Sequence, residues 1–204
     1  MIDAQGFPKL IDFGFARVLR PEERSYTVCG TVEYLAPEVV LGRGHCARVD
    51  LWSLGILIFE LLMGATPFAD GRSDEMQVCR RIVKAKPRFP RRWGATERRA
   101  KELLKRLLAR EPVKRLGGLK RGFDDIKDHP WFHEDEDFDF STLVTRACRP
   151  PWVPAARTDG DLDVTYFREW CPTDSGQFDV DTGADADAAT KAGKDSEEHE
   201  WVDF

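Results

Sequence analysis

The sequence predicts a mainly α-helical domain with a short β-hairpin at its N-terminus, and three observations lead to this prediction. Residues 49–63 form an apolar segment of helical length, and residues 97–110 repeat apolar side chains at the spacing of an amphipathic helix. Only residues 1–20 resemble two short strands around a turn, which Gly6 and Pro8 mark. The first part of the chain, at about 130 residues, is long enough to bury one core.

Residues 20–47 follow the predicted hairpin and are expected to be irregular. Glycine and proline recur here often enough to block a long helix, at Pro21, Gly30, Pro37, Gly42 and Gly44. A loop of this length inside a compact domain is usually functional or disordered. Its composition is too specific for a simple linker.

Four helices are predicted after this loop, at residues 49–63, 73–85, 97–110 and 123–129. The first is apolar on nearly all sides and is stopped by Gly64, which indicates a buried core helix. The second has acidic residues in its first turn and basic residues later, as the helix dipole favours. Thr96 can cap the third helix, and Pro130 ends the fourth.

Charge is divided unequally between the two ends of the chain. Residues 1–130 hold 25 Lys and Arg against 17 Asp and Glu, a balance of +8. Residues 131–204 hold 6 against 19, a balance of −13. This second part is poor in aliphatic residues, so it is expected to fold weakly or to lie on another surface. Within it, about residues 180–198 are predicted to be disordered.

Composition also excludes several classes of protein. No stretch approaches the ~18 uninterrupted apolar residues of a membrane span, and no secretory signal follows Met1. The five cysteines are scattered without a CxxC pair, which favours reduced thiols in the cytoplasm or the nucleus. Solvated faces of amphipathic helices explain the basic residues between positions 80 and 121 better than nucleic-acid binding does.

Three motifs follow one another at informative spacing. DFG at residues 12–14 is followed by APE at residues 36–38, and then by DLWSLG at residues 50–55 within the predicted apolar helix. A lone DFG is weak evidence, but this succession resembles the C-terminal lobe of a protein kinase. The sequence CGTVEYLAPE at residues 29–38 narrows the resemblance to the AGC group of Ser/Thr kinases.

Two further motifs, RLGG at residues 115–118 and HPWF at residues 129–132, support this resemblance. Within the AGC group the sequence is most similar to the cGMP-dependent and cAMP-dependent kinases. The resemblance implies that residues 1–132 are a partial catalytic domain that starts just before DFG and lacks the N-lobe. It also implies that residues 133–204 are an AGC C-terminal tail.

ATP and Mg²⁺ are the cofactors that the resemblance implies for the complete kinase. Asp12 of DFG would supply the carboxylate for the metal that bridges the phosphates of ATP. The competing interpretation, an aspartate in a surface turn, is much weaker with APE downstream. In the predicted tail, Phe167 and Trp170 resemble the aromatic pair that reaches the adenine pocket. Two hydrophobic residues that dock a tail elsewhere are an equally good interpretation.

Thr27 matches the activation-loop phosphorylation site of the family. A phosphate there would add about two negative charges and could order the loop by pairing with Arg17. An activating kinase is then an implied partner. The alternative is an ordinary loop threonine.

Residues of the activation segment also match positions that bind the substrate. Thr31 corresponds to the position that touches the catalytic aspartate and fixes the acceptor loop. Val28, Val32 and Leu35 would line an apolar pocket for the residue after the acceptor. Val32 replaces a proline that is common in the cyclic-nucleotide-dependent kinases.

Glu33 and Glu60 match acidic positions that hold substrate arginines in basophilic relatives, so basic proteins or peptides are the implied substrates. Charge-assisted pairing explains why carboxylates suit arginine there. Glu60 lies within an apolar helix, where a lone carboxylate is costly unless it has a partner. An internal ion pair is therefore an equally good interpretation of Glu60.

Three further residues are implied to be structural. The family pairs the positions of Glu38 and Arg115 as a buried salt bridge that anchors the activation segment. Asp50 would tie the apolar helix to the backbone of the catalytic loop.

No catalytic residue of the family is present, because the base Asp and the Asn would lie before Met1. No HRD triplet, Gly-rich loop or VAIK-type lysine occurs either, so this chain alone should not transfer phosphate. Two hypotheses follow. The chain is part of a complete AGC kinase, regulated by a cyclic-nucleotide-binding domain or subunit, or it is an inactive kinase-derived module that binds Arg-rich peptides.

Overall fold

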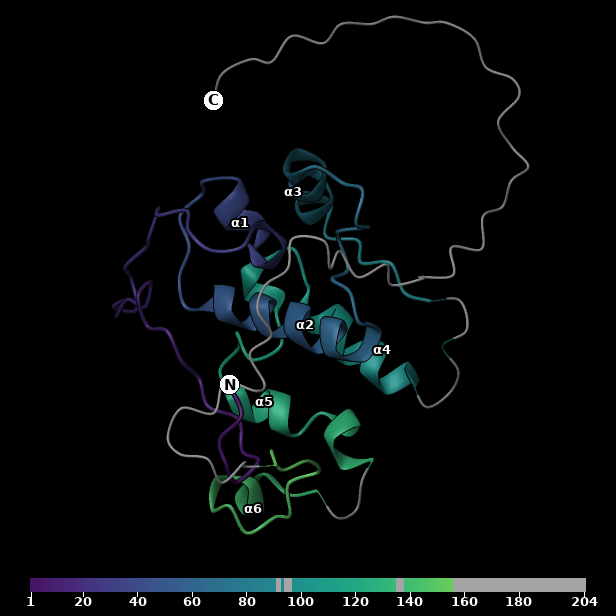
Figure 1. Ribbon diagram of the computed structural model, residues 1–204. Coiled ribbons are helices and arrows are strands. Elements are labelled where there is room, and N and C mark those ends of the chain that lie inside the picture. Colours follow the sequence, from purple (N-terminus) through teal and green to yellow (C-terminus); the bar gives the residue numbers. More distant parts are fainter. Residues whose placement is uncertain (91–92, 94–96, 135–137, 156–204) are drawn as a thin grey trace, which may run out of the picture. The chain divides into compact units, whose positions relative to one another are not determined.

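The computed structural model describes residues 1–90, 93, 97–134 and 138–155 (Figure 1). The predicted tail residues Phe167 and Trp170, the disorder expected near residues 180–198 and the Thr96 cap lie outside these residues. The elements, in chain order, are η1 (Val32–Tyr34), α1 (Pro37–Val40), α2 (Arg48–Met63), α3 (Glu75–Lys84), α4 (Glu97–Leu107), η2 (Pro112–Lys114), α5 (Phe123–Lys127), η3 (Pro130–His133) and α6 (Phe140–Val144).

The mainly helical prediction is confirmed, and the four predicted helices are α2, α3, α4 and α5. Helix α3 starts at Glu75 because the side chain of Asp74 caps it, accepting a hydrogen bond from the backbone N–H of Gln77 at 2.7 Å. Helix α2 ends where predicted, at Gly64, whose positive φ of 74° suits a residue without a Cβ. Helix α4 ends at Leu107, three residues before its predicted end at residue 110.

The predicted N-terminal hairpin is wrong in one respect: within the described residues it forms no strand. Ile2 and Pro8 make a single antiparallel bridge, and two backbone hydrogen bonds close the turn, from Asp3 N to Phe7 O and from Lys9 N to Met1 O. Pro8 has no N–H to extend the ladder. The carboxylate of Asp3 instead accepts hydrogen bonds from the N–H groups of Gln5 and Phe7, which favours a turn over paired strands.

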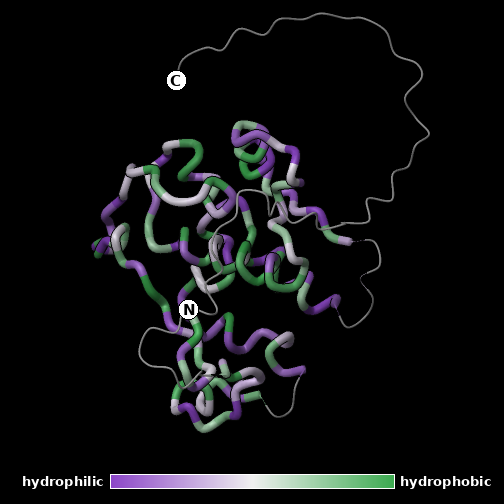
Figure 2. Tube along the Cα trace, in the orientation of Figure 1, coloured by the Kyte–Doolittle hydropathy of each residue, from purple (hydrophilic) through white to green (hydrophobic). Residues whose placement is uncertain are grey.

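Helix α2 contributes to both hydrophobic cores of the described region, and Figure 2 shows it as a mainly hydrophobic segment. One core joins α1, α2 and α3, and its buried members are Ala36, Val39, Trp52, Ile56, Phe68, Val78, Ile82 and Leu108. The other joins α2, α4 and α5, and its buried members are Leu51, Leu103, Leu107, Leu116 and Ile126. An all-round apolar helix is therefore buried on two sides.

Helices α2 and α4 approach closely at Gly55. A Cβ placed on this residue would lie 2.9 Å from Leu108 Cδ2 and 3.0 Å from Leu107 Cβ. Both distances are shorter than ordinary van der Waals contact. The glycine, unfavourable in most helices, is what lets Leu107 and Leu108 pack this closely against α2.

One face of α2 remains exposed in the described region. Leu57 and Leu61 lie one turn apart and are 42% and 76% exposed, and the neighbouring Leu62 is 45% exposed. A contiguous row of exposed large apolar side chains usually marks a surface that another part of a protein covers.

None of the helices in the described ranges has the length and the apolar run that a bilayer crossing needs.

The N-terminal turn is held by a segment from the other end of the described chain. Arg146 donates a hydrogen bond to the side-chain oxygen of Gln5 at 2.8 Å and lies 3.4 Å from the carboxylate of Asp3. Its guanidinium also lies over the ring of Phe7, at 5.2 Å from the centroid. We refer to these contacts of Arg146 as the terminal contact.

Candidate functional site

Asp12 and Gly14 form a tight, exposed turn. Asp12 has a positive φ of 62°, and one of its carboxylate oxygens, Oδ1, accepts a hydrogen bond from the N–H of Gly14 at 3.2 Å. Aspartate tolerates this left-handed backbone better than most residues because its short side chain can bond locally in this way. The geometry leaves Oδ2 directed to no partner among the described residues.

Asp12 fits a metal site in which the protein supplies one carboxylate and the bound nucleotide and water supply the other ligands. Within the residues described, no three His, Cys, Asp or Glu side chains gather closely enough to hold a metal ion. Mg²⁺ in phosphate-binding sites is usually held by one or two carboxylates together with phosphate oxygens and waters. The single free carboxylate oxygen of Asp12 suits a site of that kind.

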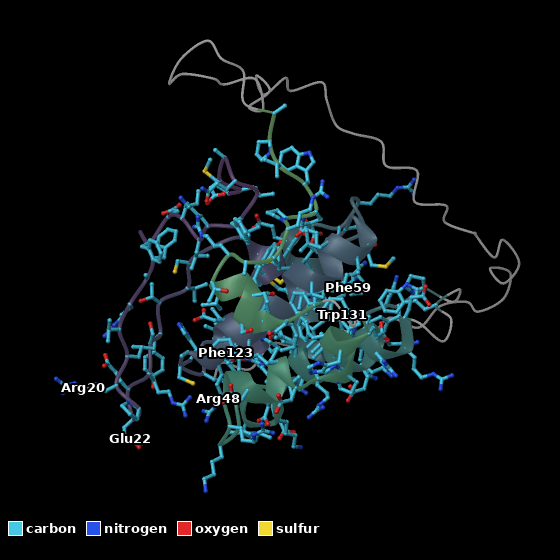
Figure 3. All side chains as sticks on the ribbon, turned by 90° about the horizontal axis from the view of Figure 1, so that it is seen from below. Arg20, Glu22, Arg48, Phe59, Phe123 and Trp131 are labelled. Atoms are coloured by element: carbon cyan, nitrogen blue, oxygen red, sulfur yellow. The ribbon has the colours of Figure 1, made fainter. Side chains whose placement is uncertain are left out.

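The segment after DFG extends away from the helices. Figure 3 places Arg20 and Glu22 at the outer edge of the structure. Arg17, which was expected to pair with a phosphate on Thr27, forms an ion pair with Glu23 at 2.6 Å. Thr27 is exposed, and its backbone N–H lies 3.4 Å from the hydroxyl of Ser25. The structure therefore presents Thr27 to solvent and gives Arg17 an acidic partner from the same segment.

This segment is fixed to the loop that precedes α2. Ser25 and His45 exchange both backbone hydrogen bonds, at 2.9 and 2.8 Å, in an isolated antiparallel bridge. The ring of Tyr26 packs on Gly44, where an added Cβ would lie 2.8 Å from the ring. Thr27 thus follows directly after an anchored pair of residues.

Glu33 and Glu60 come from different elements, and each accepts a hydrogen bond from a hydroxyl group. The phenol of Tyr34 donates a hydrogen bond to Oε2 of Glu60, and the hydroxyl of Thr66 donates one to Oε2 of Glu33. The backbone carbonyl of Tyr34 in turn accepts from the Ser53 hydroxyl of α2 at 3.2 Å. These bonds tie Glu33 and Tyr34 to the middle of α2, to its last turn and to the segment that follows it.

Both carboxylates affect the phenol of Tyr34. Burial, the hydrogen bond to Glu60 and the charges of Glu60 and Glu33 together raise the pKa of Tyr34 to about 12. The charge of Glu33 therefore reaches the same phenol that bonds Glu60. We refer to Glu33 and Glu60, with their donors Thr66 and Tyr34, as the carboxylate pair site.

Neither carboxylate of this site has a cationic partner among the described residues. Glu60 was expected either to hold substrate or to form an internal ion pair, and in the structure its partner is a neutral phenol. A hydroxyl donor leaves the formal charge of a carboxylate in place, and each carboxylate has several lone pairs to offer. Two half-buried carboxylates without a cation suit guanidinium or ammonium groups of a ligand.

The three residues predicted to line the apolar substrate pocket differ in their exposure to solvent. Val32 and Leu35 are half-buried and pack against the core shared by α1, α2 and α3. Val28 is 59% exposed, and Thr31 is exposed at the start of η1. The structure thus brings Val32 and Leu35 close to Glu33 along one short helix but leaves Val28 in solvent.

The expected pair of Glu38 and Arg115 is present and buried. Arg115 is fully buried, Glu38 is 8% exposed, and Nη1 and Nη2 of Arg115 each donate to a different oxygen of Glu38. Arg115 also donates to the backbone carbonyls of Ala109 and Arg48 and lies over the ring of Trp52. The APE motif is therefore connected to the RLGG motif and to α2.

Asp50, unlike Glu38 and Arg115, does not form the contact that was expected of it. Its side chain is exposed, and no hydrogen bond reaches its carboxylate within the part of the chain that the structure describes. Although Asp50 is open to solvent on one side, the protein atoms around its carboxylate desolvate it and raise the pKa of Asp50, and the charge of His45 opposes this effect. The tie to a catalytic loop that was expected of Asp50 has no counterpart among the described residues.

Two members of the carboxylate pair site were missed by sequence reasoning. Tyr34 lies between Glu33 and Leu35 in the CGTVEYLAPE motif, so the sequence offered its phenol as a possible hydrogen-bond donor to a nearby carboxylate. Thr66 lies 33 residues after Glu33 and beyond the end of α2, and no spacing rule connects the two. Only the fold reveals Thr66 as a partner.

Comparison with known proteins identifies the family to which these motifs belong. Residues 1–132 match the family model described as protein kinase domain. The chain is 40% identical to human cGMP-dependent protein kinase 2 over 189 residues, which are 92% of this chain and 24% of that protein.

Two other relatives match to a similar degree. Mouse cAMP-dependent protein kinase catalytic subunit PRKX is 43% identical over 162 residues, which are 79% of this chain and 43% of that protein. Mouse ribosomal protein S6 kinase alpha-4 is 42% identical over 174 residues, which are 83% of this chain and 22% of that protein. The chain therefore spans less than half the length of each of these curated relatives.

Proposed function

The chain belongs to the protein kinase family, and from this premise we propose that it is the C-terminal part of an AGC-type Ser/Thr kinase of the cyclic-nucleotide-dependent kind. Joined to the catalytic residues that would precede Met1, it would transfer the γ-phosphate of ATP to Ser or Thr in basic substrates. The observation that carries this proposal is the 40% identity to a cGMP-dependent kinase over 92% of the chain. The exposed apolar face at Leu57 and Leu61 agrees with a lobe that is covered in a longer protein.

Asp12 is the residue of this chain that would hold the metal. Its free Oδ2 would be a Mg²⁺ ligand, and the metal when bound supplies the charge that offsets the phosphates of ATP. Gly14 fixes the other oxygen of Asp12, so the carboxylate is already oriented before a ligand arrives. The adenine-contacting role of Phe167 stays a prediction, since Phe167 lies outside the described residues.

The carboxylate pair site is proposed to bind the substrate. Glu33 and Glu60 would receive arginine side chains, since each is half-buried and bonded only to a neutral hydroxyl. Thr31, Val32 and Leu35 lie in or beside η1 and would position the acceptor segment. Glu38, Arg115 and Asp50 would support this surface without touching the substrate.

The first experiment determines the transcript sequence upstream of Met1. If the proposal holds, an open reading frame continues upstream and encodes an HRD triplet, a Gly-rich loop and a VAIK-type lysine. The extended chain should then phosphorylate a Ser peptide that carries upstream arginines, and Asp12→Asn should abolish this activity. In-frame stop codons without HRD codons upstream would contradict the kinase proposal.

Thr27 is proposed to be a regulatory phosphorylation site, and an activating kinase is the implied partner. Its exposure and its place directly after the anchored pair Ser25 and Tyr26 support this role. A phosphate there could draw Arg17 away from Glu23, because a dianion attracts a guanidinium more strongly than one carboxylate does. Glu23→Gln should then raise the effect of phosphorylation on loop protection in hydrogen exchange, and an unchanged exchange pattern would argue against it.

A second candidate function is an inactive module that binds Arg-rich peptides. The cation-free carboxylates of Glu33 and Glu60 favour it, because peptide binding needs no catalytic residue. The test is a pull-down of the 204-residue chain with an Arg-rich peptide, with Glu60→Ala as control. Equal capture of both proteins would end this hypothesis.

A further inference from the structure

Thr66 holds the carboxylate of Glu33 from a position that the backbone fixes on both sides. Gly64 ends α2 in the left-handed conformation, with its N–H bonded to Glu60 O at 2.7 Å. Pro67 follows Thr66 and restricts its backbone further. Phe68, fully buried, stacks on Trp52 with ring centroids 5.6 Å apart. The Thr66 hydroxyl is thus presented by a rigid segment.

The side chain of Thr66 is itself restrained. Thr66 is only 9% exposed, and a β-branched side chain has few χ1 rotamers. Its hydroxyl donates to Oε2 of Glu33, so one oxygen of that carboxylate has a fixed direction. Glu33 remains half-buried, and Oε1 accepts no hydrogen bond from the described residues.

A hydroxyl differs from a cation in what it does to the carboxylate. Lysine or arginine at this position would neutralise Glu33 and compete with a basic ligand for the same oxygens. Threonine orients the carboxylate and leaves its negative charge available. Tyr34 stands in the same relation to Glu60, so both carboxylates of the site are oriented by neutral donors.

We propose that Thr66 is a positioning residue that holds Glu33 in the orientation which receives a guanidinium group of a basic peptide. This inference rests on the proposed binding of Arg-rich peptides at the carboxylate pair site and adds a residue that determines its affinity. Without the hydroxyl, Glu33 samples several rotamers, and a bound arginine must order it. Immobilising one such side chain weakens binding about threefold to tenfold.

The experiment uses the 204-residue chain and a fluorescein-labelled peptide with two arginines upstream of a serine, measured by fluorescence anisotropy. Thr66→Val removes the donor and keeps the shape of the side chain, whereas Thr66→Ser keeps the donor. We expect Thr66→Val to weaken binding about threefold to tenfold and Thr66→Ser to stay within about twofold of the parent chain.

A double-mutant cycle separates positioning from a general loss of structure. In the Glu33→Gln background Thr66→Val should have no further effect, because the carboxylate that it orients is gone. If Thr66→Val does not fold, as judged by thermal melting, Thr66→Ala is compared with Thr66→Ser in the same cycle. A variant that only disturbed the fold would weaken binding equally in both backgrounds, which would overturn the inference.

The two proposals fail in different ways. If Glu33→Gln leaves peptide affinity unchanged, or the parent chain binds no peptide, the proposed peptide site is wrong, and the role of Thr66 falls with it. If Glu33→Gln weakens binding and Thr66→Val does not, the peptide site stands and the positioning role of Thr66 is overturned.

Discussion

Arg115 and Glu38 are 77 residues apart in the sequence and form a doubly hydrogen-bonded ion pair, with both N–O distances at 2.6 Å. The pair is buried, and three backbone carbonyls, those of Arg48, Ala109 and Arg110, also accept from the same guanidinium. Arg115 thereby satisfies polar groups from three separate segments. A neutral replacement of the whole pair would leave those carbonyls without donors.

Glu38→Gln is expected to lower the free energy of unfolding by about 3–5 kcal/mol, because it leaves the buried guanidinium of Arg115 without its counter-charge. Urea unfolding followed by circular dichroism measures the change. Lys114→Met is the matched control, since Lys114 pairs with Glu111 on the surface and such pairs contribute about 0–1 kcal/mol. Similar losses for the two variants would contradict the importance of the buried pair.

Gly55→Ala should destabilise the chain even though alanine favours helices. The gain in helix propensity is about 1 kcal/mol, whereas forcing a methyl group against Leu108 and Leu107 costs about 1–3 kcal/mol. We expect a lower melting temperature for Gly55→Ala. In a Leu108→Ala background the same substitution should become nearly neutral, because the space is then open. A penalty of equal size in both backgrounds would disprove the steric explanation.

Tyr34 should make the stability of the chain depend on alkaline pH. Its folded-state pKa of about 12 lies above the ordinary value of 10.0, so the folded chain keeps the proton that the unfolded chain releases. This contribution is complete below about pH 10 and is lost as the pH rises towards about 12. Urea unfolding at several values between about pH 8 and pH 11 should show a steeper fall for the parent than for Tyr34→Phe.

Glu60→Gln provides the control for this titration. The amide oxygen can still accept from the phenol, but the negative charge is gone, so the pKa of Tyr34 should fall. Ultraviolet absorbance of the phenolate measures the shift directly. An unchanged phenolate titration in Glu60→Gln would mean that the charge of Glu60 does not contribute to the raised pKa of Tyr34.

The exposed leucines of α2 should cause the isolated chain to self-associate. Leu57→Lys combined with Leu61→Glu is expected to reduce binding of the dye ANS and to shift the chain towards a monomer in sedimentation. Leu119→Lys is the control, because Leu119 is also exposed, at 56%, but lies outside α2. A parent chain that is monodisperse and binds no ANS would contradict the prediction.

The sequence predicted the helices well where local pattern decides them. The periodic leucines of α4 and the apolar length of α2 required no knowledge of distant residues. The hairpin prediction failed because one proline and one aspartate determined the local hydrogen bonds more strongly than strand propensity did.

The candidate site was predictable only in part. Motif positions identified Glu33, Glu60 and the partners Glu38 and Arg115, but they could not reveal which neutral donors orient the carboxylates. Thr66 reaches Glu33 because α2 ends at Gly64 and the chain turns back, which is a tertiary effect. Arg17 was predicted only as a partner of a phosphate on Thr27, and its ion pair with Glu23 was not predicted.

The terminal contact has a consequence for the order in which the protein folds as it is synthesised. Gln5 accepts its hydrogen bond from Arg146, which lies 141 residues later in the sequence. The N-terminal turn therefore cannot form this contact until nearly all of the described chain has left the ribosome. Helices α2 and α4 can pack much earlier, because their leucines emerge within about 60 residues of one another. Within the described residues, the N-terminal turn is therefore among the last parts to gain its final contacts.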